Sequence, residues 1–202
     1  MASSPPNANS DSAWQQIQTR VRELETLLSI DGLLNWDQGT YLPGRGATLR
    51  GEQLALVSAL LHQRWCDPVL ARLVGELPQT DAVKIAAKRN LTRRIATEQL
   101  VSEALVQDLA KAKAEGYAAW VEAKKNASFG AFLPYLTRLV ELTQIRAEAV
   151  AEGTSLTSPY DALLAEYDPD SRIATLRPMF EKLTYKLSPL ASEIVERQGR
   201  DN

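Results

Sequence analysis

The sequence predicts an all-α protein, and three observations lead to that prediction. From residue 12 onward, apolar side chains recur at helical steps of three and four residues, and no stretch shows the alternation of a β-strand. Proline and glycine gather at a few positions, where they separate one periodic segment from the next. The chain has 202 residues, 45% of them hydrophobic, which is enough to bury a core without disulfides or metal ions. We expect a multihelical bundle with a long helical hairpin or arm.

The first residues differ in composition from the rest. Residues 1–11 are mostly serine, proline, asparagine and alanine, without the basic stretch and apolar core of a signal peptide. We expect them to be a disordered leader. Residues 12–202 are expected to form a single all-helical domain, as their length allows.

The first two helices are predicted to flank an irregular segment. The first begins at a capping box of Ser12 and Gln15 and fades near Asn35. Residues 36–46 hold three glycines and one proline, so they are predicted to form an irregular loop. The second helix then covers residues 47–65. The apolar seam of the first helix consists of Trp14, Ile17, Val21, Leu24 and Leu28.

The middle of the chain is predicted to be one long helical segment with a break. Asp67 and Pro68 are typical of an N-cap and a first helical turn, and they open a short helix that ends before Pro78. From Asp81 to Asn126 the helical pattern continues without a proline. Because a helix of that length suggests either a coiled coil or two helices that meet at an unmarked break, we expect a long helical arm with an interruption near Ala96–Leu100.

Three further helices are predicted in the last third of the chain. One begins near Ser128 and stops at Gly153, and a short one opens at Ser158-Pro159 and runs through Tyr167. The last is interrupted by two prolines, Pro178 and Pro189, so it is predicted to be kinked or segmented, and to end at Gly199. Its seam consists of Ile173, Leu176, Phe180, Leu183, Leu187, Leu190 and Ile194.

Scarce residues exclude most catalytic machinery. The chain has one cysteine, Cys66, and one histidine, His62. It can form neither an internal disulfide nor a zinc site of the His-Glu-x-x-His type, which needs two histidines. No phosphate-binding loop and no Gly-x-Ser-x-Gly elbow are present. We therefore expect no catalytic residue, no metal ligand and no cofactor in this chain, and a reducing, cytoplasmic location.

Charge and hydropathy also argue against two classes of partner. The 23 Lys and Arg residues nearly balance the 25 Asp and Glu residues, whereas nucleic-acid-binding proteins usually carry a basic excess. The longest nearly apolar run, residues 54–61, is far shorter than the ~20 residues of a membrane span. We expect neither nucleic acid nor a membrane to be a partner.

Three features admit both a functional and a structural interpretation. For His62 we favour a neutral side chain at the edge of the core over a catalytic one. The basic run Lys84–Arg94 is favoured as a solvated helix face over an anion site. A set of aromatic side chains is favoured as core over a stacking platform. That set consists of Tyr117, Trp120, Phe129, Phe132 and Tyr135.

The stretch from Trp36 to Arg50 leaves two interpretations open. It places a tryptophan and a charged residue in a glycine-rich connection, which a simple connector would not require. The loop could shape a functional groove. Alternatively, Asp37 or Thr40 could cap the neighbouring helices while Trp36 closes the end of the bundle.

Several collinear motifs resemble the N-terminal part of the M32 family of metallocarboxypeptidases. The first runs Leu34-x-Trp36-Asp37-Gln38-x-Thr40-x-x-Pro43, followed by Arg50, Gln53 and Ala55, with His62 downstream. Later matches are Trp120-x-x-Ala123, Phe129-x-x-Phe132-x-Pro134, Pro159-Tyr160-Asp161-Ala162-Leu163-Leu164 and Phe180-x-x-Leu183 through Leu190. Together they span residues 13–198.

This resemblance implies a helical fold in which zinc, held by two histidines and a glutamate, activates water to release C-terminal amino acids from peptides. In the family these ligands lie beyond the region matched here, so we expect the chain to be inactive alone. Trp36, Asp37, Gln38, Thr40, Pro43, Arg50 and His62 carry over only as motif positions without an assigned role. We expect either self-association or a separate catalytic half as the partner; the alternative function is a helical interaction or oligomerisation module.

Overall fold

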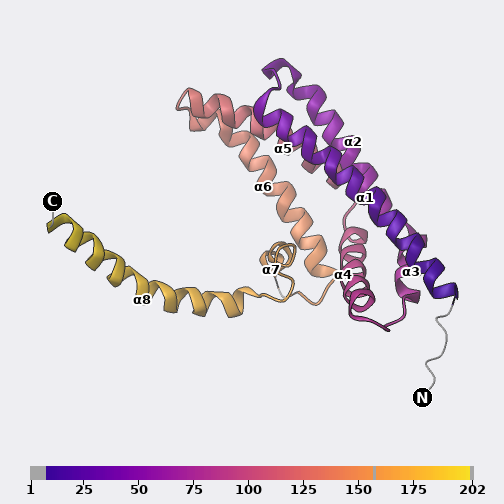
Figure 1. Cartoon of the computed structure of the whole chain (residues 1–202). Helices are drawn as coiled ribbons and strands as arrows, with labels where there is room; N and C mark the ends of the chain where they lie inside the picture. Colours follow the sequence, from indigo (N-terminus) through magenta and orange to yellow (C-terminus); the bar gives the residue numbers. More distant parts are fainter. Residues whose placement is uncertain (1–7, 157, 201–202) are drawn as a thin grey trace. The chain divides into compact units, whose positions relative to one another are not determined.

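The structure is a computed structural model, which describes residues 8–156 and 158–200 (Figure 1). All regular structure in these two ranges is helical, which confirms the predicted all-α class. The elements are α1 (Ala8–Thr40), the 3-10 helix η1 (Gly44–Gly46), α2 (Ala47–Trp65), α3 (Pro68–Glu76), α4 (Ala82–Gln99), α5 (Glu103–Lys125), α6 (Phe129–Glu152), α7 (Pro159–Leu164) and α8 (Ile173–Arg200).

The chain divides into two compact units, Met1–Ala149 and Val150–Asn202, so the division falls near the end of α6. The prediction of a single domain over residues 12–202 stays a prediction. In the residues that the structure covers, no helix is both long enough and apolar enough to cross a bilayer.

The main core of the first unit joins α1, α3 and α4. Its centre is nearly inaccessible to solvent: Ile17 and Leu24 of α1 are 1% exposed, and Leu70 of α3 is fully buried. These side chains recur at helical spacing on each element, so each helix contributes one apolar face. The cluster consists of Ile17, Leu24, Leu70, Leu73, Val74, Leu77 and Ile95.

Two smaller clusters bring α5 against its neighbours. Leu54 and Ala55 of α2 pack on Ala110 and Ala114 of α5, and such small side chains allow the two helices to lie close together. On its other side, α5 packs against Leu142 of α6. A Cβ atom on Gly116 of α5 would come within 2.9 Å of Leu139, so glycine is required there by the close approach of α6.

The start and end of α1 differ from the prediction. The helix already includes residues 8–11, so Ser12 lies inside it and the predicted capping box does not form; residues 1–7 of the expected leader lie outside the described residues. At the other end the helix continues past Asn35 to Thr40, so residues 36–40 are helical rather than irregular. The carbonyl of Asp37 accepts hydrogen bonds from the N–H groups of Tyr41 (2.9 Å) and Leu42 (3.0 Å), which complete the last turn before Pro43.

Most of the other predicted boundaries are confirmed. The Asp67 side chain caps α3 by accepting from the Val69 N–H (2.8 Å), and α3 ends before Pro78. The long middle segment breaks at Leu100, where predicted, and Ser102 caps α5. Ser158 caps α7, although that helix ends at Leu164 rather than Tyr167.

The later helices differ from the prediction in two respects. Of the two outcomes predicted for the last helix, kinked or segmented, segmentation does not occur: α8 continues through Pro178 and Pro189 as one curved helix to Arg200, one residue past Gly199 (Figure 1). The aromatic set is not core: Phe129 is 62% exposed and Trp120 is 41% exposed, and of the five only Phe132 is half-buried. The helical spacing places these rings on one side of their helices, but the described part of the chain does not cover that side.

The second unit is organised around one buried carboxylate. Asp161 of α7 is 1% exposed and accepts a hydrogen bond from the Ile173 N–H at the start of α8 (2.8 Å). The first turn of a helix has N–H groups without intrahelical acceptors, so this contact caps α8 with a side chain from another element. From Arg177 to Gln198 the side chains of α8 are exposed.

Candidate functional site

The motif residues around the α1–α2 connection meet at Arg50, in the first turn of α2. Arg50 is 7% exposed, and its guanidinium donates in three directions. It bonds the Leu34 carbonyl of α1, the Asp37 carboxylate (2.5 Å) and the Gln53 side-chain oxygen (3.0 Å). A planar guanidinium with fixed donors suits such a junction, because it can satisfy several acceptors at once. Arg50 therefore fixes the end of α1 against the start of α2.

Gln38 extends this junction to α5. Its side-chain N–H donates to the Ala114 carbonyl (3.1 Å), which lies in the zone where α2 and α5 pack closely. The side-chain oxygen of Gln38 is buried and has no hydrogen-bond partner in the structure. Gln38 thus connects two helices that are far apart in sequence, and it leaves one acceptor unused.

Thr40 and Pro43 lie where α1 ends and the chain turns into η1. The Thr40 hydroxyl donates to the Trp36 carbonyl one turn earlier (2.8 Å), and Pro43 precedes the 3-10 turn η1 in extended conformation. Both residues end α1 and direct the chain into α2. The Thr40 contact lies within α1, so it is not the cap of a neighbouring helix that the sequence suggested, and the Asp37 carboxylate accepts from the Arg50 side chain.

Trp36 does not close the end of the bundle. It is 58% exposed and packs edge to face against Tyr41, with the ring centroids 5.5 Å apart. Tyr41 itself is 74% exposed, so the pair forms an aromatic surface beside the buried Arg50 junction. Exposed aromatic rings are rare on a surface without a partner and are common at interfaces.

His62 belongs to a different site. It lies 12 residues after Arg50 on the same helix, which corresponds to about 18 Å along α2. Its Nδ1 atom is 3.2 Å from a carboxylate oxygen of Glu98 in α4, and both side chains are buried. The other oxygen of Glu98 accepts from Arg94 (2.7 Å), and the Arg94 guanidinium lies over the Trp65 ring. This second junction connects α2 to α4.

Cys66 lies one turn after His62 and is affected by the same carboxylate. Burial raises the pKa of the Cys66 thiol, and the negative charge of Glu98 raises it further. A raised thiol pKa means less thiolate at neutral pH, whereas nucleophilic cysteines have a lowered pKa. Cys66 therefore lacks the electrostatics of a nucleophile.

A zinc ion does not fit the residues present. Within residues 8–156 and 158–200, no group of three or more His, Cys, Asp and Glu side chains is arranged to hold a metal ion. The two imidazole nitrogens of His62, the one histidine of the chain, already face Glu98 and Cys66. Catalytic zinc sites use three protein ligands, commonly two of them histidines.

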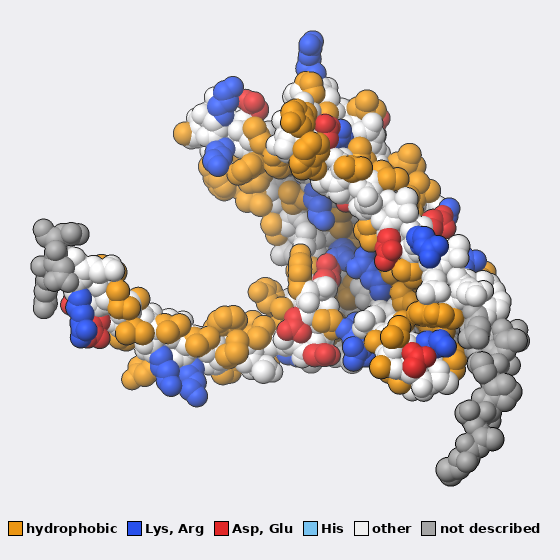
Figure 2. Space-filling view, viewed as in Figure 1, with side chains coloured by type: hydrophobic (Ala, Val, Ile, Leu, Met, Phe, Trp, Pro, Cys, Tyr) orange, Lys and Arg blue, Asp and Glu red, His pale blue; other side chains and the backbone are white. Residues whose placement is uncertain are grey.

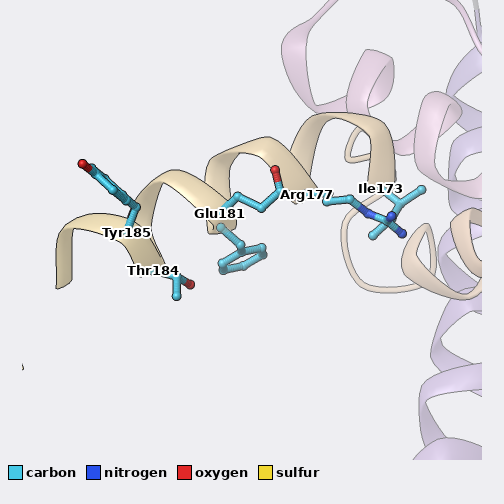
Figure 3. Close-up of a pocket in the computed structure, with 6 residues that line it drawn as sticks. Ile173, Arg177, Glu181, Thr184 and Tyr185 are labelled. Carbon is cyan, nitrogen blue, oxygen red and sulfur yellow. The ribbon is translucent and has the colours of Figure 1, made fainter. Parts of the chain in front are cut away.

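A shallow depression on α8 does not form an enclosed site either. Figure 3 shows that its lining side chains come from a single helix. They are Ile173, Arg177, Phe180, Glu181, Thr184 and Tyr185. One helix cannot surround a small molecule, so this is a surface rather than a pocket.

Two side chains that connect helices were not among the residues predicted from the sequence. Glu98 contacts both His62 and Arg94, and the sequence indicates only the second contact, because Glu98 follows Arg94 by four positions on one helix. Lys88, in the run expected to be solvated, donates to the Gly75 (2.7 Å) and Leu77 (3.0 Å) carbonyls and so caps the end of α3. Part of the basic run thus has a structural role.

The fold and these junctions define a class: an all-helical scaffold whose charged motif residues connect neighbouring helices. A family model described as Carboxypeptidase Taq (M32) metallopeptidase matches residues 16–202. The chain belongs to this M32 family.

Individual relatives agree with this assignment. Thermostable carboxypeptidase 1 of Thermus thermophilus is 34% identical over 197 residues, covering 92% of this chain and 39% of that protein. Thermostable carboxypeptidase 1 of Pyrococcus furiosus is 27% identical over 185 residues, covering 90% and 36%. The chain therefore spans less than two fifths of the length of these curated relatives.

Solved structures show the same fold. The apo-Mg structure of the Pyrococcus furiosus carboxypeptidase superposes with a TM-score of 0.74 at 26% identity, over 95% of this chain and 38% of that one. A structure titled BsuCP superposes with a TM-score of 0.83 at 20% identity, over 91% and 37%, and this similarity concerns the fold alone.

Proposed function

We propose that this chain is the N-terminal helical region of an M32 metallocarboxypeptidase. In this proposal it contributes to the release of amino acids from peptide C-termini only together with a region that supplies the zinc ligands. The chain alone is inactive. The names of the relatives, which are carboxypeptidases, support the reaction class.

The observation that carries the proposal is that this chain has too few histidines for the zinc site of the family. Zinc lowers the pKa of a bound water and thereby generates the nucleophile, and this requires a ligand set that keeps one position open. One histidine cannot provide two imidazole ligands. That histidine is moreover buried against Glu98, with its ring used in the α2–α4 junction.

The role left for the motif residues is to build the scaffold. Arg50, Asp37 and Gln38 fix α1, α2 and α5 relative to one another through buried polar contacts. Such contacts are specific in geometry and costly to leave unsatisfied, so they hold helices in one arrangement. A rigid helical wall is what a separate metal-binding region would need in order to place a peptide.

The test combines metal analysis with an assay of C-terminal release on the purified chain. We expect zinc well below one equivalent after dialysis, and no release of amino acids from a blocked peptide. One equivalent of zinc together with release would overturn the proposal. His62→Gln is measured alongside, because a zinc site built as in the family needs histidine, and His62 is the one histidine of this chain.

The alternative, a helical interaction module, is favoured by the exposed aromatic rings of the first unit, such as Trp36 and Phe129. The two functions differ in what accompanies the chain. A neighbouring reading frame that encodes a His-Glu-x-x-His segment supports the carboxypeptidase scaffold. A genome without such a frame supports the interaction module.

A further inference from the structure

We draw no further inference here: the strongest candidate, the exposed apolar face of α8 (Figure 2), carries nothing, because the chain spans less than two fifths of its curated relatives and nothing in the structure shows what covers this face.

Discussion

The two units of the molecule use one sequence pattern with opposite results. In the first unit, the seam of α1 is covered by α3 and α4, and Ile17 and Leu24 are 1% exposed. In the second unit, α8 has equally regular spacing, yet Leu187 is 54% exposed. Periodicity thus determines which face of a helix is apolar, whereas its burial depends on the other elements that reach it.

The polar contacts of the two units differ in the same way. The first unit adds the Arg50 and Glu98 junctions to an existing apolar core. The second unit depends on Asp161, which joins α7 to α8 where few apolar side chains are buried. We expect mutations to separate these two modes of stabilisation.

The largest effect is expected for a matched pair of leucines. Leu70→Ala removes a fully buried side chain from the first core and should lower the free energy of unfolding by about 3 kcal/mol. Leu190→Ala changes an exposed position and should change it by less than about 0.5 kcal/mol. Urea unfolding followed by circular dichroism measures both values. Equal losses would contradict the contrast between the seams.

The next effect concerns the Arg50 junction. Arg50→Ala leaves the Leu34 carbonyl and the Asp37 carboxylate without their buried donor, and we expect a loss of about 2 kcal/mol. The value lies below that of a fully buried pair because Asp37 can be hydrated. Arg50→Lys keeps the charge but not the three-way geometry, and should recover about half of the loss.

In the second unit, Asp161→Ala should lower stability by about 1.5 kcal/mol, because the first N–H group of α8 loses a charged acceptor. Asp161→Asn retains a side-chain oxygen and is expected to cost less. Amide hydrogen exchange at Ile173 measures the effect locally. Unchanged protection in Asp161→Ala would show that α8 does not depend on this contact.

The smallest effect concerns Cys66. Its pKa is raised by burial and then by Glu98, so its alkylation by iodoacetamide should need a higher pH than that of a free thiol. Glu98→Gln removes the negative charge, lowers the thiol pKa and shifts the pH profile of alkylation downward. Glu115→Gln, at an exposed position of α5, is the control and should leave the profile in place.

Local signals in the sequence predicted the helices well. Asp67 and Ser158, both predicted to open a helix, are N-caps with side chains that bond the first turn, and such contacts involve only residues close in the chain. The predicted end of α1 near Asn35 is too early, because Gly39 does not break the helix and the Asp37 carbonyl closes one more turn.

The site was only partly predictable. The sequence identified the motif residues Asp37 and Arg50 and left open what they do, since their pairing depends on how α1 meets α2. Glu98 was missed because its partner His62 lies 36 positions earlier and on another helix. The exposure of Phe129 could not be predicted either, because the hydrophobic pattern shows which side of a helix is apolar but not which element packs against that side.

The division into two units has a practical consequence for spectroscopy. All four tryptophans, Trp14, Trp36, Trp65 and Trp120, lie in the segment up to Ala149, and none follows it. Indole emission therefore reports only the first unit, while the tyrosines of the second, such as Tyr185, are the sole aromatic chromophores there besides Phe180. A transition of the second unit is therefore expected in a backbone signal and not in the indole emission.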